Sequence, residues 1–212
     1  MPDHPLYNDK AALRSHLLAE RRALSPERRA AAAAALAERA LPLVPAGGVV
    51  AAYVSVGAEP GTRPLLDLLA ARGLRVLLPV LLPDNDLDWA PYQGAGHLAP
   101  AGRGLLEPTA PRLGPAAIGT AALVLLPGLA VDRRGLRLGR GGGSYDRVLA
   151  RLDELTGHAG HPGPLLATLL YESELLERVP AEPHDRPVHA AVTPAGVHHF
   201  ADPAAGPSAA TA

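Results

Sequence analysis

The feature that most constrains the fold is an alternation of short apolar runs with a capped helical stretch. An almost entirely apolar run at residues 49–56 precedes a helical stretch that Thr62 can cap and Gly73 can end, and a second apolar run follows at residues 74–81. Such runs suit strands covered on both faces, as in parallel sheets, and this order predicts right-handed βαβ units. We therefore expect an α/β fold, with a mostly parallel sheet and helices on both faces in a Rossmann-like three-layer arrangement.

Further apolar runs extend the predicted sheet, at residues 122–127, 164–170 and 188–193. Residues 82–120 are rich in proline, glycine and aspartate, and we expect them to be mostly loop, although the part around Trp89 could form an outer strand. A loop of this length in a compact domain is usually functional or mobile.

The N-terminal part of the chain is predicted to be helical. Leucines at near-helical spacing indicate an amphipathic helix over residues 10–23. Ser25, Pro26 and Glu27 then supply an N-cap, a first-turn proline and a first-turn acid for an alanine-rich helix that ends near Ala40. We therefore expect a helical hairpin at the start of the fold.

Composition limits the class of protein and its partners. The 212 residues fit a single domain, expected over residues 1–200, followed by a tail at 201–212 whose lack of apolar periodicity predicts disorder. A formal net charge of -1 gives no basic excess for nucleic acid, and the absence of cysteine excludes disulfides, thiolate catalysis and cysteine-ligated zinc. Without a signal peptide pattern or an apolar run of about 20 residues, we expect a cytoplasmic protein with no membrane partner. We also expect a monomer.

The segment at residues 137–147, RLGRGGGSYDR, is the most informative part of the chain. It follows an apolar strand, and a helix is expected from about residue 143 to residue 152. Glycines ahead of a helix let backbone N–H groups approach an anion, and the helix N-terminus adds a favourable dipole. Arg137 and Arg140 flank the loop, and guanidinium groups match phosphate oxygens. The segment therefore predicts a phosphate-binding loop.

The segment does not match the known phosphate-binding patterns. GxGxxG counted from Gly139 fails at Ser144, and the Walker pattern fails because no lysine precedes a serine or threonine. A flexible loop with solvated arginines is therefore an alternative on these residues alone. Asp146, in the first turn of the expected helix, could hold a magnesium ion beside phosphates or only complement the helix dipole.

The same segment resembles the 5-formyltetrahydrofolate cyclo-ligase family, also called methenyltetrahydrofolate synthetase. The family pattern PGLAFD followed by GxRLGRGxGYYD is matched by PGLAVDRRGLRLGRGGGSYD at residues 127–146. Four further matches occur in the family's order: Lys10 with Arg14, Glu59 with Thr62, Gly-Leu-x-Glu-Pro at residues 104–108, and Pro-x-Glu-x-His-Asp at residues 180–185. Matches at five separate places are hard to produce by chance, so the resemblance covers nearly the whole chain.

The resemblance implies an enzyme, a ligase that forms a carbon–nitrogen bond. It would cyclise 5-formyltetrahydrofolate to 5,10-methenyltetrahydrofolate with ATP as co-substrate and Mg²⁺ as cofactor. The formyl oxygen would attack the γ-phosphorus of ATP, N10 would close the ring, and phosphate would depart, with no protein nucleophile. The partners would therefore be the small molecules formylfolate and ATP.

The resemblance also implies the site residues, position by position. Arg140 and Lys10 are expected to act in catalysis, and Asp146 and Asp185 to hold Mg²⁺. The folate is expected to contact six further residues in addition to Arg140: Val54, Glu59, Gly141, Gly142, Gly143 and Ser144. ATP is expected to contact two segments, which comprise Lys10, Ala11, Ala12, Leu13, Arg14, Arg137, Leu138, Gly139, Arg140, Gly141, Gly142, Gly143, Ser144 and Tyr145.

Two departures from the family pattern keep alternatives open. Many members have lysine where this chain has Gly142 and tyrosine where it has Ser144. This chain therefore lacks a positive charge that could bind phosphate and an aromatic ring that could stack on a ligand. A formylfolate-binding protein without catalysis, or an ATP-dependent enzyme for another small carbonyl substrate, would also fit. A metal hydrolase based on His158 and His161 is disfavoured by their glycine- and proline-rich context, and we assign no chemical role to His184.

Overall fold

The structure, a computed structural model, describes residues 9–159, 163–182 and 185–200. The predicted tail at residues 201–212, His161 and His184 lie outside these residues, and the side chain of His158 is likewise not described. Among the described residues, no helix combines the length and the apolar character needed to span a bilayer.

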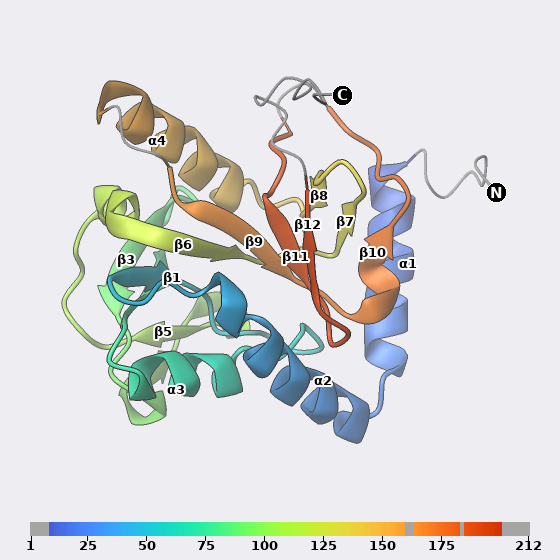
Figure 1. Cartoon of the computed structure of the whole chain (residues 1–212), viewed down its shortest axis with the longest axis horizontal. Helices are drawn as coiled ribbons and strands as arrows, with labels where there is room; N and C mark the ends of the chain where they lie inside the picture. Colours follow the sequence, from blue (N-terminus) through green and yellow to red (C-terminus); the bar gives the residue numbers. More distant parts are fainter. Residues whose placement is uncertain (1–8, 160–162, 183–184, 201–212) are drawn as a thin grey trace, which may run out of the picture.

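A seven-stranded sheet forms the centre of the molecule, in the order β12-β11-β9-β6-β1-β2-β3 (Figure 1). The five inner strands pair in parallel, whereas each edge strand is antiparallel to its neighbour. The predicted mostly parallel sheet is therefore confirmed. The strands are β1 Val49–Ala51, β2 Arg75–Leu81, β3 Leu87–Pro91, β6 Ala121–Leu126, β9 Leu165–Leu169, β11 Ala190–Val192 and β12 Val197–His199.

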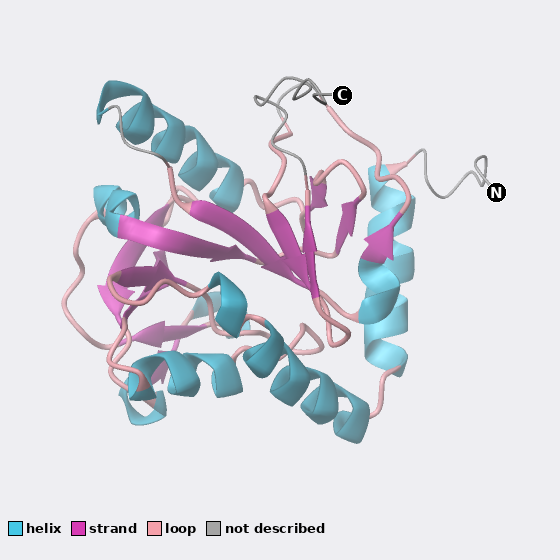
Figure 2. Ribbon diagram, viewed as in Figure 1, coloured by secondary structure: helices cyan, strands magenta, loops and turns pink. Residues whose placement is uncertain are grey.

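Helices cover both faces of this sheet (Figure 2). Helices α2 (Pro26–Arg39) and α3 (Arg63–Ala71) pack on one face, in a core that includes Leu36, Leu66 and the β1 residue Val50. Helix α4 (Ser144–Ala159) packs on the other face with the 3₁₀ segment η5 (Pro115–Thr120). The three-layer arrangement agrees with the prediction, and it follows from strands that are apolar on both faces.

The N-terminal helical hairpin is also confirmed, as α1 (Lys10–Ala23) followed by α2. The Ser25 hydroxyl accepts a hydrogen bond from the Arg28 N–H at 3.3 Å, as expected of an N-cap. The two helices bury their apolar faces in different places. Helix α1 packs against a small sheet in the order β10-β7-β8, through a cluster that includes Leu13, Leu17 and Leu138.

This small sheet was not predicted from the sequence. Its strands are β7 Ala130–Asp132, β8 Arg137–Leu138 and β10 Leu175–Leu176, which are too short to show a period. The buried carboxylate of Asp132 accepts hydrogen bonds from the N–H groups of Arg134, Leu136 and Val179. It thereby holds the turn between β7 and β8 beside the chain that follows β10.

The predicted strand at residues 49–56 is shorter in the structure and ends at Ala51. Beyond it, the Ser55 N–H donates to the Thr62 hydroxyl at 2.9 Å, and the Val56 N–H donates to Glu59 Oε2 at 2.8 Å. Thr62 therefore does not cap α3 with its side chain, contrary to our prediction, because its hydroxyl stabilises the loop instead. The loop leaves the sheet at the carboxyl end of β1.

The long segment at residues 82–120 contains more structure than predicted. The outer strand around Trp89 is β3, and Trp89 itself is fully buried in the core. A hairpin of β4 (Leu98–Pro100) and β5 (Leu106–Pro108) follows, with 3₁₀ turns at Ala95–His97 and Gly102–Gly104. Two other 3₁₀ turns are η2 Leu41–Leu43 and η6 Glu172–Glu174.

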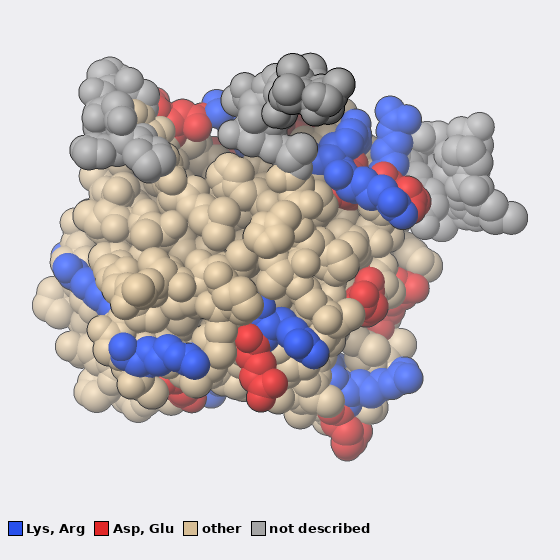
Figure 3. Space-filling model, viewed as in Figure 1, with Lys and Arg blue, Asp and Glu red and all other residues tan. Residues whose placement is uncertain are grey.

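Charged side chains are scattered over the face shown in Figure 3, around a broad uncharged area. Both signs occur on this face, and basic side chains gather beside acidic ones at its upper right. This distribution agrees with the small formal net charge of -1.

Candidate active site

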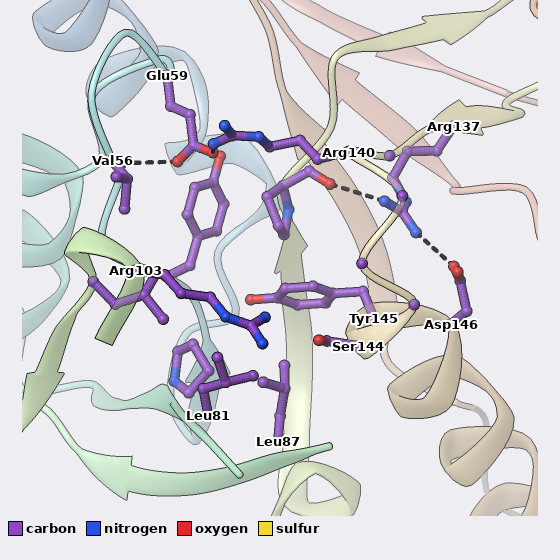
Figure 4. A pocket seen from close by; sticks show the side chains of 18 of the residues that line it. Val56, Glu59, Leu81, Leu87, Arg103, Arg137, Arg140, Ser144, Tyr145 and Asp146 are labelled. Carbon is purple, nitrogen blue, oxygen red and sulfur yellow. Dashed lines mark hydrogen bonds and ion pairs between the residues drawn. The ribbon is translucent and has the colours of Figure 1, made fainter. Parts of the chain in front are cut away.

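A cavity of about 550 Å³ lies at the carboxyl ends of β1, β2 and β6 (Figure 4). In open α/β sheets, ligands bind outside the carboxyl ends of the strands. One part of its wall is apolar and comes mostly from β2, β3 and β5, including Leu81, Leu87 and Leu106. The glycine-rich loop and α1 supply the charged part, so the cavity suits a ligand with both aromatic and anionic groups.

The glycine-rich loop joins β8 to the N-terminus of α4. Gly141 and Gly143 have φ values of 92° and 74°, which residues with a side chain rarely adopt. Gly142 has an ordinary φ, and a Cβ atom added there meets no other atom within 4 Å. Arg14, in α1, donates a hydrogen bond from Nε to the Gly139 carbonyl at 2.9 Å, which connects the loop to α1.

Arg137 lies under the loop as a nearly buried cation, with a side chain only 7% exposed. Its Nη1 donates to the Pro127 carbonyl at 3.0 Å, and its Nη2 donates to Asp146 Oδ1 at 3.1 Å. Burial lowers the pKa of Arg137, and the nearby carboxylate of Asp146 acts in the opposite direction. Arg137 thus joins the end of β6 to the first turn of α4.

Lys10 lies at the start of α1 between two carboxylates. Its Nζ is 2.7 Å from Asp185 Oδ2 and 3.0 Å from Glu182 Oε2. Burial opposes the charge of Lys10, but the hydrogen bonds to both carboxylates raise its pKa above the ordinary value. Lys10 therefore carries its positive charge at neutral pH.

Glu59 and Arg140 form an ion pair across the cavity, with Glu59 Oε1 3.2 Å from Arg140 Nη1. The Glu59 side chain is 11% exposed, whereas that of Arg140 is 55% exposed. Tyr145 points into the same space, as Figure 4 shows, and its buried hydroxyl has no hydrogen-bond partner in the part of the chain that the structure describes. Burial, followed by the charge of Glu59, raises the pKa of Tyr145, so the hydroxyl is neutral and can donate to a ligand.

The model of the 5-formyltetrahydrofolate cyclo-ligase family matches residues 7–194 of the chain. A 5-formyltetrahydrofolate cyclo-ligase of Mycolicibacterium smegmatis is 43% identical over 190 residues, which are 87% of this chain and 93% of the relative. The chain belongs to this family. It is therefore an enzyme of the ligase class, as predicted.

More distant members of the cyclo-ligase family agree with this assignment. The Escherichia coli enzyme is 32% identical over 84% of this chain and 96% of its own length. The solved structure of Aquifex aeolicus 5,10-methenyltetrahydrofolate synthetase superposes with a TM-score of 0.73 at 27% identity, covering 94% of this chain and 95% of that one. The family fold is thus present along nearly the whole chain.

The structure brings most of the residues that the family resemblance implied into the one cavity. Lys10, Arg14, Val54, Glu59 and Asp185 line it, as does the entire run from residue 137 to residue 146. Ala11, Ala12 and Leu13 are not among the lining residues, and the Leu13 side chain is buried against the small sheet.

Eleven lining residues had no assigned site role in the sequence analysis: Tyr53, Val56, Pro79, Leu81, Leu87, Arg103, Leu105, Leu106, Glu107, Pro127 and Glu182. The motif at residues 104–108 and the motif at residues 180–185 contain four of them, but the motifs did not show that these side chains face the site. Glu107 accepts a hydrogen bond from the Leu81 N–H at 2.9 Å, so it joins the hairpin of β4 and β5 to β2.

Asp146 and Asp185 are the carboxylates available for the magnesium ion that the family resemblance implies. Within the described ranges, no three His, Asp or Glu side chains converge as a metal cage. Mg²⁺ is usually bound through one or two carboxylates together with substrate phosphates and water, so two acids beside a phosphate loop fit this ion. Each acid is also within ion-pair distance of a cation, Arg137 or Lys10.

Proposed function

We propose that this cyclo-ligase family member cyclises 5-formyltetrahydrofolate to 5,10-methenyltetrahydrofolate, with hydrolysis of one ATP to ADP and phosphate. The observation that carries the proposal is the shared cavity, in which a glycine-rich loop at a helix N-terminus faces an apolar wall. The loop suits the phosphates of ATP, and the wall suits the rings of a reduced folate.

The chemistry explains why ATP is needed. The oxygen of the N5-formyl group is a poor leaving group, so N10 cannot close the ring until that oxygen is activated. In the proposed reaction, the formyl oxygen attacks the γ-phosphorus and ADP departs, which leaves a phosphorylated imidate-like intermediate. N10 then attacks its carbon and loses its proton, and the C–O bond breaks to release phosphate.

The protein acts mainly by positioning the substrates and by neutralising charge on the transferring phosphoryl group. Lys10, Arg14 and Arg140 can reach phosphate oxygens from two sides of the loop, because α1 and the loop line the same cavity. Mg²⁺ bound through Asp146 and Asp185 would add positive charge at the phosphates. Glu59 is proposed to accept hydrogen bonds from the pterin.

ATP binding requires an exchange of partners in this site. Lys10 pairs with Asp185, and Arg140 pairs with Glu59. Phosphate oxygens can replace the carboxylates as partners of both cations, which frees Asp185 for the metal and Glu59 for the pterin. The same ion pairs hold the side chains near their proposed working positions before the ligands arrive.

The direct test follows the absorbance of methenyltetrahydrofolate after the protein is mixed with 5-formyltetrahydrofolate, Mg²⁺ and ATP. We expect a rise that requires ATP and that Asp146→Ala abolishes without unfolding the protein, since the Asp146 side chain is 60% exposed. Tight formylfolate binding without any ATP-dependent rise would instead identify a folate-binding protein. Phosphate release with a different carbonyl substrate alone would identify a related ATP-dependent enzyme.

A further inference from the structure

Arg103 differs from the other cations that line the cavity, because it has no partner among the residues that the structure describes. Lys10, Arg137 and Arg140 each pair with a carboxylate, and Arg14 donates to a backbone carbonyl. Arg103 forms no hydrogen bond or ion pair with any residue that the structure describes, although it lines the same cavity. A cation that faces a ligand cavity without a counter-charge is suited to an anionic group of the ligand.

The backbone also presents Arg103 to the cavity in an unusual way. Arg103 lies at the tip of the hairpin formed by β4 and β5, and its φ of 59° is in the left-handed region that residues other than glycine rarely adopt. Such strained positions are commonly found at functional sites. The Leu81 N–H donates a hydrogen bond to Glu107, which holds the hairpin against the sheet. The strands of the hairpin are therefore fixed, and the strain lies at its tip.

Arg103 lies away from Arg137 and Asp146. In Figure 4, its side chain extends into the middle of the cavity, between Tyr145 and Leu81 in this view, while Arg137 and Asp146 lie farther to the right. Glu59, the proposed pterin contact, lies at a third place along the wall. A folate bound by its pterin at Glu59 and lying along the apolar wall would bring its far end toward Arg103.

We propose that Arg103 binds a carboxylate of the glutamate tail of the formylfolate. This inference rests on the proposed function and adds a substrate contact to it. The far end of a reduced folate carries an aminobenzoyl ring followed by the α- and γ-carboxylates of glutamate. The apolar side chains Leu81, Leu87 and Leu106 suit the ring, and the guanidinium of Arg103 matches a carboxylate in a two-point contact.

The test compares Arg103→Gln with the wild-type enzyme on two substrates, 5-formyltetrahydrofolate and 5-formyltetrahydropteroate, which lacks the glutamate. We expect the variant to raise the KM for formylfolate about tenfold, as for loss of a partly exposed charged hydrogen bond, and to leave the KM for ATP unchanged. The pteroate should have a raised KM with the wild-type enzyme and no further increase with Arg103→Gln. Arg103→Lys should give an intermediate KM for formylfolate.

Arg112→Gln is the matched control, because Arg112 is an exposed arginine in the same segment that does not line the cavity. An equal effect of Arg103→Gln on both folates, no effect on either, or a raised KM for ATP would overturn the proposal. A wild-type enzyme that forms no methenyl product would show instead that the proposed function fails. Binding of the two folates without ATP, measured by calorimetry, would then test the Arg103 contact separately.

Discussion

The two carboxylate oxygens of Glu59 interact with different partners. Oε2 accepts a hydrogen bond from the Val56 N–H, which fixes the side chain on its own loop, while Oε1 faces Arg140. The residue is therefore held in place by the protein, with one oxygen directed to an exchangeable partner. A side chain held in this way can bind a ligand without losing further rotamer freedom.

We expect Glu59→Gln to raise the KM for 5-formyltetrahydrofolate by about tenfold, because the amide loses a charged acceptor for the pterin. The KM for ATP should change much less. Steady-state kinetics with each substrate varied in turn would measure both. A larger effect on the KM for ATP than on that for folate would defeat the pterin assignment.

Gly142 is a position where the family's lysine can be restored. Its φ is not in the left-handed region, and an added Cβ meets open space, so a side chain fits there. We expect Gly142→Lys to lower the KM for ATP about two- to fivefold, because an exposed ion pair contributes up to about 1 kcal/mol. Kinetics with ATP varied would measure the change.

Two alanine variants serve as controls for that substitution. Gly142→Ala should leave the KM for ATP unchanged, since it adds no charge. Gly143→Ala should impair activity, because Gly143 has a φ of 74°. If Gly142→Ala lowered the KM as much as Gly142→Lys, the effect would come from loop stiffness and not from charge.

Among the elements, α4 is positioned by a contact with the turn before β3. Arg151 donates to both oxygens of Asp86, at 3.1 and 2.7 Å, and both side chains are largely shielded from solvent. The hydrogen bonds from Arg151 lower the pKa of Asp86 below its usual value of 3.8, although burial opposes this. Since α4 begins at the glycine-rich loop, this pair also supports the site.

We expect Asp86→Asn to lower the free energy of unfolding by about 1 to 3 kcal/mol at neutral pH. The folded-state pKa of Asp86 is depressed, so its contribution is present above the usual carboxyl pKa and is lost as pH falls through the folded-state value. The difference between wild type and variant should therefore shrink in acid. Urea unfolding at neutral and acidic pH would measure this.

Asp84→Asn provides the control for the Asp86 variant. Asp84 Oδ2 lies 3.7 Å from Arg147 Nη1, and both side chains are more than half exposed. This ion pair is therefore expected to contribute little to the free energy of unfolding. An Asp86→Asn effect that did not decrease in acid would exclude the ion pair as its cause.

At the scale of the whole molecule, a buried ion pair connects α1 with the rest of the protein. Arg21 Nε lies 2.6 Å from Glu174 Oε1, and Arg21 Nη2 donates to the Gly128 carbonyl at 2.6 Å. Tyr171 lies beside Arg21, and its hydroxyl donates to the Ala58 and Glu59 carbonyls at 3.3 Å. These contacts join α1 to the turn after β6 and, through Tyr171, to the loop that carries Glu59. We propose that the chain is one domain.

We expect Arg21→Met to lower the free energy of unfolding by about 3 to 5 kcal/mol, because it leaves the buried carboxylate of Glu174 without its positively charged partner. A single transition should be seen by circular dichroism and by the fluorescence of Trp89, the only tryptophan. Adding Glu174→Gln should recover part of the loss by removing the unpaired charge. Transitions that separate between the two probes would contradict a single domain.

Residues close together in the chain were sufficient to predict the local elements of this protein and the nature of its main motif. Apolar runs predicted the inner strands, the Ser25 cap and the proline at position 26 predicted the start of α2, and clustered glycines predicted a loop ahead of α4. These features depend on residues that are near one another in the chain. The short strands of the small sheet and the role of Thr62 did not follow, because neighbours distant in sequence decide them.

The tertiary structure alone decided which charges meet in the site. Lys10 and Asp185 are 175 positions apart, and Arg14 and Gly139 are 125 positions apart. The motifs predicted that these residues matter, but only the packing of α1 against the small sheet brings them together. Arg103 carried no sequence signal of its own, because its place in the cavity depends on how a hairpin folds back over the sheet.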